Sequence, residues 1–331
     1  MKEIVEKKKR RLPRILVTLV LVCVVIALVG AGEYLIKYAI GRSGDGGNRT
    51  VALEVNPAAE GTEKLLQEGR ERAKEEYETF VEVYEPGVET LTIEKDVTIS
   101  AGYFEAEEPT HRTVILIHGY RGRHEGMYAY AYNYLQEGWN VLMPDLRGCG
   151  ESGSDYIGMG WTDREDMLSW IDSLVERDAE AEIILHGVSM GGATVMMTSG
   201  EETPDQVKAF VEDCGYTSVW DIFKSELGLR FHLPAFPILD VASALAKLQA
   251  DYSFKEASAL EQVKKCEKPM IFFHGSEDNF VPFDMEHVLY EAKPGDNKKE
   301  VIAEGAGHGE SVYLLGDDYW EDIFEFVEAY M

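Results

Sequence analysis

The first apolar stretch of the chain is continuous rather than periodic. From Ile15 to Gly32, eighteen residues include Thr18 as the only polar side chain. That length is near the minimum for a helix that crosses the hydrocarbon core of a bilayer. A stretch rich in Lys and Arg, from Lys7 to Arg14, comes directly before it, which predicts a cytoplasmic N-terminus and an extracytoplasmic main domain. The pattern therefore predicts a basic tip and a single-pass transmembrane anchor over residues 1–40.

A cleaved secretory signal is the alternative interpretation of the same segment. The apolar region of a signal peptide is usually shorter, about 7–15 residues, and only Val29-Gly30-Ala31 resembles a small-residue cleavage site here. We therefore favour an uncleaved anchor in the cell membrane over secretion after cleavage.

Three different patterns follow the apolar segment. Residues 41–48 are rich in Gly, Ser and Asp, which predicts a flexible tether. From Glu60 to Phe80, apolar residues recur at helical spacing among charged ones, which predicts an amphipathic helix. Alternation from Val88 to Phe104 predicts one or two antiparallel strands. We assign residues 41–87 to a linker with this helix and residues 88–331 to the main domain.

Within the main domain, short apolar runs alternate with longer amphipathic stretches. The runs that we predict as strands are Thr113–Ile117, Asn140–Met143, Glu182–Leu185, Ala209–Val211, Met270–Phe273 and Glu300–Ala303. Uninterrupted apolar runs are typical of parallel strands that are covered by helices on both faces. The predicted fold class is therefore α/β, with a mostly parallel central sheet flanked by helices.

One long segment interrupts this alternation of predicted strands and helices. The segment from Tyr216 to Lys265 is too long for a simple crossover and too apolar for a disordered loop, and it contains Pro234 and Pro237. We predict a helical cap insertion over about residues 216–265, at the carboxyl edge of the sheet where α/β active sites lie. The alternative is a set of ordinary helices on the flank of the sheet.

Charge makes one class of partner improbable. The chain has 32 Lys and Arg against 60 Asp and Glu. Residues 1–14 hold seven basic and two acidic residues, so the remainder has 25 basic (32 − 7) and 58 acidic residues (60 − 2), a net charge of −33. Such a body repels phosphate backbones, and we expect no nucleic acid partner. The cysteines match neither a zinc motif nor a disulfide framework and are predicted to be isolated thiols.

A Gly-x-Ser-x-Gly motif is the strongest chemical signal. It spans Gly187 to Gly191, after the predicted strand at Glu182–Leu185 and before a predicted helix. In such a strand–turn–helix elbow the serine adopts strained backbone angles, and the residues two positions away must lack bulk. We therefore predict Ser189 as the nucleophile.

A serine hydroxyl needs a general base, and the base needs an orienting carboxylate. With this motif, the acid and then the histidine are expected after the serine. Asp278 and His308 both follow predicted strands, so we assign Asp278 as the acid and His308 as the base; Glu277 and Asp213 are rival acids. Other polar residues at strand ends are predicted to brace loops: His118, His186, His274, Asp145 and Arg147.

These motifs occur in a recognisable order: His118-Gly119-Tyr120, Asp145 to Ser152, the serine elbow, Asp278 before Val281-Pro282, and Gly307-His308-Gly309. In this order, residues 91–331 resemble a serine hydrolase of the α/β-hydrolase superfamily. The chain is similar to membrane-anchored bacterial hydrolases of the prolyl-oligopeptidase-like and serine aminopeptidase-like group. The resemblance implies the α/β-hydrolase fold and an oxyanion hole built from the backbone amides of Tyr120 and Met190.

The expected reaction is hydrolysis of an ester, thioester or small amide of a small-molecule acyl substrate through an acyl enzyme. It requires no metal and no cofactor. Two other readings remain open: an acyltransferase that uses the same acyl enzyme, and a noncatalytic, membrane-tethered binding module that retains the fold.

Overall fold

The computed structural model describes residues 2–42, 61–85, 87–93 and 96–331, with side chains from residue 15 onward. Most of the predicted tether lies outside these ranges. The predicted amphipathic helix is confirmed as α2, Glu63–Val83. The predicted antiparallel pair is also confirmed, as the two strands β1, Gly87–Thr92, and β2, Thr98–Phe104.

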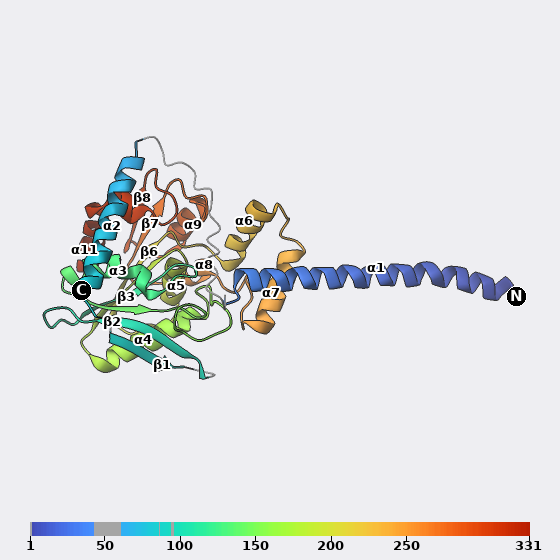
Figure 1. Cartoon of the computed structure of the whole chain (residues 1–331), viewed down its shortest axis with the longest axis horizontal. Helices are drawn as coiled ribbons and strands as arrows, with labels where there is room; N and C mark the ends of the chain where they lie inside the picture. Colours follow the sequence, from blue (N-terminus) through green and yellow to red (C-terminus); the bar gives the residue numbers. More distant parts are fainter. Residues whose placement is uncertain (1, 43–60, 86, 94–95) are drawn as a thin grey trace.

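The N-terminal segment forms one helix, α1, Lys2–Ala39. Its segment Ile15–Ala39 contains an 18-residue window with a mean hydropathy of 3.0 and is long and apolar enough to cross a membrane. By length and composition, a membrane anchor and a signal sequence both fit it. Figure 1 shows that α1 projects from the rest of the protein and meets it only at its C-terminal end.

The sheet has eight strands in the order β1-β2-β4-β3-β5-β6-β7-β8. From β4 onward in this order, neighbouring strands are parallel, whereas β1 and β2 are antiparallel to their neighbours at one edge. The mostly parallel sheet predicted from the apolar runs is therefore confirmed. The strands are β1 Gly87–Thr92, β2 Thr98–Phe104, β3 Arg112–Ile117, β4 Asn140–Pro144, β5 Glu182–Val188, β6 Val207–Asp213, β7 Met270–Gly275 and β8 Lys298–Ala303.

Helices cover both faces of the sheet. Because side chains alternate along a strand, Ile115 and Ile117 of β3 enter one apolar core, while Val114 and Leu116 enter the other. The first core lies under α4, α5, α8 and α9, and the second under α2, α3 and α11. The helices after α2 are α3 Tyr128–Gln136, α4 Asp163–Arg177, α5 Met190–Ser199, α6 Val219–Phe231, α7 Ile238–Gln249, α8 Ala259–Val263, α9 Asp284–Ala292, α10 Ser311–Leu315 and α11 Asp317–Glu328.

The segment predicted as a cap, residues 216–265, holds α6, α7 and α8 between β6 and β7. Its helices lie in two different places. Helix α8 packs on α5 and α9 at the flank of the sheet. Helices α6 and α7 instead lie beside the C-terminal end of α1 (Figure 1), and α7 contacts α1 directly.

Candidate active site

The serine motif forms a sharp turn between β5 and α5. Ser189 has φ 59° and ψ −115°, a left-handed conformation that is unfavourable for a residue with a side chain. The flanking glycines are required sterically: a Cβ on Gly187 would lie 2.2 Å from the carbonyl oxygen of Gly191, and one on Gly191 would lie 2.0 Å from that of Ile117. The Ser189 N–H donates to the carbonyl of Asp213 on β6 at 2.7 Å. The turn therefore holds the serine at the carboxyl end of the sheet.

The three residues predicted as a catalytic set meet at this edge. His308 Nε2 lies 2.8 Å from Ser189 Oγ, and His308 Nδ1 lies 2.7 Å from Asp278 Oδ2. With the imidazole proton on Nδ1 and donated to Asp278, Nε2 is free to accept the proton of the serine hydroxyl. The phenyl ring of Phe280 packs edge-on against the His308 imidazole, with centroids 4.8 Å apart. Side chains 119 and 30 residues apart along the chain are thus joined by hydrogen bonds.

The Asp278 carboxylate is buried yet well supplied with donors. Its Oδ1 accepts the backbone N–H groups of Phe280 and Val281, each at 2.9 Å. Burial alone would raise the pKa of Asp278, but hydrogen bonds from His274 and His308 outweigh it and lower the pKa to about 2. Asp278 is therefore ionised at neutral pH and can stabilise a positive charge on His308.

The rival acids point elsewhere. Asp213 is fully buried and accepts hydrogen bonds from the Ser311 hydroxyl at 3.0 Å and the Tyr319 hydroxyl at 3.1 Å. Burial raises the pKa of Asp213 to about 6. The Glu277 side chain is exposed on the loop surface. Of the carboxylates weighed from the sequence, Asp278 is the one that contacts the His308 ring.

The loop after β3 lies against the nucleophile. A Cβ on Gly119 would be 3.5 Å from the Ser189 Cβ, so the next residue, Tyr120, begins beside the serine. Met190 is the first residue of α5, where backbone N–H groups have no partner within the helix. Neither amide donates a hydrogen bond to another group in the described part of the chain. Both amides are thus available to a developing oxyanion.

Most of the predicted bracing residues hold loops at this edge. His118 bonds the carbonyl of Gly119 through Nδ1 and the N–H of Leu146 through Nε2, at 2.7 and 3.0 Å. Asp145 accepts the N–H groups of His124 and Glu151, each at 2.8 Å. These contacts confirm the predicted bracing by His118 and Asp145.

The prediction for His186 needs correction. Its two ring nitrogens bond the hydroxyls of Tyr134 and Tyr319, each at 3.0 Å, and not loop backbone. The ring lies in the core between α3 and α11, and burial lowers its pKa to about 3. Its neighbours come from distant helices, so the local sequence contained no signal for them.

Two features were not found from the sequence. His274 bonds the Val281 carbonyl at 3.0 Å, as expected for a loop brace, but the same Nε2 also lies 3.3 Å from Asp278 Oδ2. The spacing of four residues between this histidine and the acid was the available signal. Second, the Tyr120 hydroxyl donates to the carbonyl of Ala39, so the end of α1 is tied to the loop beside Ser189.

Helix α2 supports the histidine loop from outside. Glu310 accepts the N–H of Gly307 at 2.8 Å and pairs with Arg70 of α2. Gly69 lets α2 approach closely, because a Cβ there would lie 2.0 Å from the Tyr313 carbonyl oxygen. The amphipathic helix thus fixes the loop that carries His308.

Metal binding receives little support from the side chains present. Potential ligand atoms of Cys214, Asp278 and His308 lie within 4.8 Å of one another. However, the carboxylate and imidazole already bond each other, and burial keeps the pKa of the Cys214 thiol well above its usual range, so it stays protonated. A second set, His124, Glu125 and Asp145, is engaged in the loop bracing described above.

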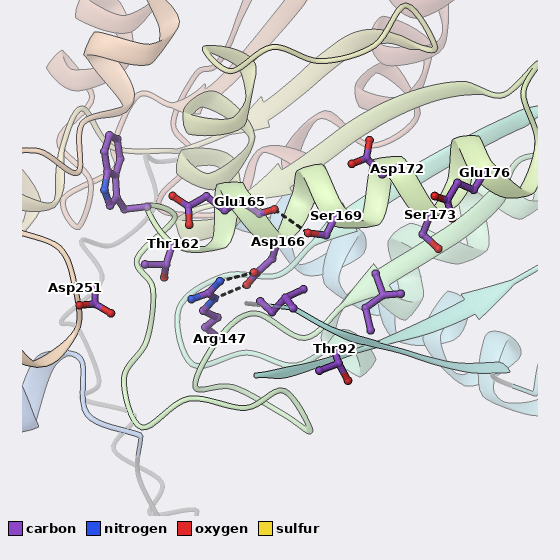
Figure 2. Close-up of a pocket in the computed structure, with 13 residues that line it drawn as sticks. Thr92, Arg147, Thr162, Glu165, Asp166, Ser169, Asp172, Ser173, Glu176 and Asp251 are labelled. Atoms are coloured by element: carbon purple, nitrogen blue, oxygen red, sulfur yellow. Dashed lines mark hydrogen bonds and ion pairs between the residues drawn. The ribbon is translucent and has the colours of Figure 1, made fainter. Parts of the chain in front are cut away.

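A groove of about 790 Å³ lies on another part of the domain, between the end of β1 and α4. Figure 2 shows Arg147 among the residues that line it, held by Asp166 through two hydrogen bonds, each 2.7 Å long. This pair confirms the predicted bracing role of Arg147. The groove is lined by the acids Glu165, Asp172 and Glu176 and by none of the three residues that meet at the elbow.

The family model described as serine aminopeptidase, S33, matches residues 108–245. The uncharacterized protein YqkD of Bacillus subtilis is 30% identical over 228 residues, which cover 69% of this chain and 74% of YqkD.

Two solved structures share the fold. The Pyrococcus furiosus esterase Pf2001 has a TM-score of 0.62 at 21% identity, covering 76% of this chain and 95% of the esterase. The Pyrococcus horikoshii acylaminoacyl peptidase has a TM-score of 0.59 at 18% identity, covering 76% of this chain and 44% of the peptidase. The sheet order, the serine elbow and these matches together show that the chain belongs to the α/β-hydrolase superfamily, within its serine aminopeptidase-like group.

Proposed function

We propose that the protein is a serine hydrolase that cleaves an ester, thioester or small amide through an acyl enzyme, with Ser189 as nucleophile, His308 as general base and Asp278 as orienting acid. The hydrogen-bonded series from Asp278 through His308 to the Ser189 hydroxyl is the observation that carries the proposal. Such a series is what activates a hydroxyl that is otherwise a weak nucleophile at neutral pH.

The reaction has two halves. Ser189 Oγ attacks the carbonyl carbon as its proton passes to His308 Nε2, and collapse of the tetrahedral intermediate expels the leaving group, which takes that proton. Water then gives a proton to His308 and attacks the acyl carbon, which releases the acid and restores the Ser189 hydroxyl. Throughout, the ionised Asp278 stabilises the imidazolium form of the base.

The oxyanion is assigned to the amides of Tyr120 and Met190. They come from two different elements, the β3 loop and the start of α5, which is the arrangement needed to hold one oxygen from two sides. Helix α5 adds the favourable field of its N-terminus.

The proposal includes a membrane location. Its support is the apolar segment Ile15–Ala39 and the basic stretch before it. In this arrangement α1 is an uncleaved anchor, the N-terminus is cytoplasmic, and the hydrolase domain with its acyl substrate is extracytoplasmic.

A fluorophosphonate probe tests the function directly. We expect the full chain, purified in detergent, to be labelled on Ser189 and to hydrolyse short p-nitrophenyl esters. The Ser189→Ala variant is expected to lose the labelling and at least about a thousandfold in kcat/KM, since the nucleophile is absent.

The matched control is Ser169→Ala on α4, whose hydroxyl only donates to the Glu165 carbonyl. It is expected to label and turn over as the unmodified protein does. Labelling that persists in Ser189→Ala contradicts the proposal. Product analysis with added acceptor alcohols separates hydrolysis from acyl transfer.

A further inference from the structure

The α6–α7 connection exposes apolar side chains in a strongly acidic protein. The stretch from Leu227 to Leu239 contains no acidic residue, although Asp and Glu make up 60 of the 331 residues. Within it, the side chains of Leu229, Leu233 and Phe236 are 56%, 42% and 76% exposed. Large apolar side chains that cluster at a surface mark an interaction site. The nature of the partner follows from how α1 is attached.

The base of α1 is packed firmly on this insertion. Gly32 is the first buried residue of the helix, and a Cβ there would lie 3.0 Å from Cγ1 of Val241 on α7. Below it, Ile36 and Ile40 are fully buried, and the Tyr38 ring meets Phe231 of α6 edge-on, with centroids 5.7 Å apart. The insertion and the end of α1 therefore form one packed unit.

The free part of α1 is short for a membrane span. Residues 15–31 are seventeen positions, apolar except for Thr18, before the packed end, and at 1.5 Å per residue they extend about 26 Å. The hydrocarbon core of a bilayer is about 30 Å thick, and any tilt of the helix shortens its reach further. For these residues to span the hydrocarbon core, the surface of the bilayer must lie at the level of α7. Figure 1 shows the α6–α7 connection extending along α1 in the direction of its N-terminus.

The same unit adjoins the candidate active site. The backbone amide of Tyr120 is assigned to the oxyanion, and its hydroxyl donates a hydrogen bond to the carbonyl of Ala39 at the end of α1. Arg121 bonds the carbonyls of Tyr38 and Gly41 at 3.0 and 3.2 Å. The insertion itself begins shortly after Asp213, whose carbonyl accepts the Ser189 N–H. The membrane side of the protein and the catalytic edge of the sheet are therefore adjacent.

We propose that the α6–α7 connection lies in the bilayer interface beside α1 and that the enzyme takes long-chain acyl esters or amides directly from the membrane. This inference rests on the proposed function for its substrate class and on α1 as an anchor for its orientation. The exposed apolar residues bury their surface among lipid acyl chains, which removes the cost of exposing them to water. Tyr120 bonds the end of α1 and follows Gly119, which lies against Ser189, so this surface adjoins the loop beside the nucleophile.

A spin label tests the surface by itself. In a Cys23→Ser background of the full chain, nitroxides at Phe236→Cys and at Val83→Cys are compared in phosphatidylcholine vesicles. Val83 is the matched control because it is 64% exposed and ends α2, which lies on the side of the body away from α1 (Figure 1). We expect position 236 to collide mainly with oxygen, which partitions into lipid, and position 83 mainly with a water-soluble nickel chelate. Equal access of the nickel chelate to both positions overturns the proposal that the α6–α7 connection lies in the bilayer interface.

Activity tests the substrate class. For the double variant Leu233→Ser, Phe236→Ser, we expect the rate on a long-chain ester embedded in vesicles, divided by the rate on a short soluble ester, to fall about tenfold, because two apolar contacts with the bilayer are lost. Val83→Ser is expected to keep the ratio, and fluorophosphonate labelling of each variant reports an intact site. If the double variant leaves this ratio of rates unchanged, the proposal that the enzyme takes its substrate from the membrane is overturned.

The two failures are distinguishable. A label immersed in lipid in a protein that hydrolyses neither ester overturns the proposed function and leaves the membrane surface in place. A protein that hydrolyses the soluble ester while its label at position 236 is exposed to water overturns the membrane surface and leaves the proposed function in place.

Discussion

At the scale of single residues, the environment of Asp278 makes it a better partner for His308 than the exposed carboxylate beside it. Asp278→Asn preserves the shape but removes the charge that favours an imidazolium, and the amide nitrogen can force the wrong tautomer on the ring. We expect kcat/KM for a short ester to fall about a thousandfold to ten-thousandfold, as measured by steady-state kinetics.

Glu277→Gln is the neighbouring control. Its side chain is exposed, so we expect kcat/KM to stay within about twofold of the unmodified value, as is usual for a surface substitution. A loss in Glu277→Gln as large as that in Asp278→Asn contradicts the assignment of the acid.

Behind the site, two buried glutamates predict a pH-dependent stability. Burial raises the pKa of Glu212 to about 8, and burial together with the charges of Glu212 and Glu300 raises the pKa of Glu286 to about 9. Both oxygens of Glu286 are buried without a hydrogen-bond partner among the described residues, which favours the neutral acid. In the unfolded chain a glutamate ionises near its ordinary pKa of 4.5.

The direction in which stability changes with pH follows from the difference between the folded and unfolded pKa values. Between the unfolded and folded pKa values the folded state binds more protons, so the stability is fully present below about pH 4.5 and is lost as the pH rises towards about 8 to 9. We expect the Tm to fall from pH 6 to pH 9, and Glu286→Gln to reduce that fall by at least about 2 °C. Thermal unfolding of the full chain in detergent at several pH values measures it. An equally steep fall in Glu286→Gln means that other groups dominate this pH range.

At the scale of elements, the serine turn depends on close approach of backbone segments. A methyl group on Gly191 meets the backbone of β3, which cannot move without disturbing the centre of the sheet. We expect Gly191→Ala to lower the Tm by about 5 °C or more and to abolish fluorophosphonate labelling, since overpacking of this kind costs about 1–3 kcal/mol or more. Differential scanning fluorimetry and gel labelling are the measurements.

Gly126 is the matched control position for Gly191→Ala. A Cβ at this position has nothing within 4 Å. Gly126→Ala is therefore expected to keep both stability and labelling. Retained labelling in Gly191→Ala shows that the turn can relax and that its glycine is dispensable.

At the scale of the whole molecule, the net charge of −33 outside residues 1–14 sets a long-range field. An anionic ester is repelled during its approach, and salt screens this repulsion. We expect kcat/KM for an anionic ester, relative to a neutral ester of the same size, to rise about two- to threefold between about 20 mM and about 300 mM salt. Parallel kinetics on both esters in detergent measure it. A ratio that falls with salt indicates a local positive site that outweighs the overall charge.

The sequence by itself determined the features that depend on contiguous residues. Apolar runs predicted the parallel strands, because a strand buried on both faces must be apolar along its length. The Gly-x-Ser-x-Gly spacing predicted the turn at Ser189, because the steric demand of the elbow falls within five residues. Asp278 and His308 were within reach of prediction because both follow strands, and the carboxyl ends of parallel strands share one edge.

Only the tertiary structure decided which distant side chains meet. The two tyrosine partners of His186 and the packing of α1 on the α6–α7 insertion join residues from separate elements. Such contacts depend on how helices and strands pack in three dimensions, and no local pattern in the chain encodes that packing. The sequence thus specified the chemistry at each strand end, and packing selected which groups lie within hydrogen-bond distance of one another.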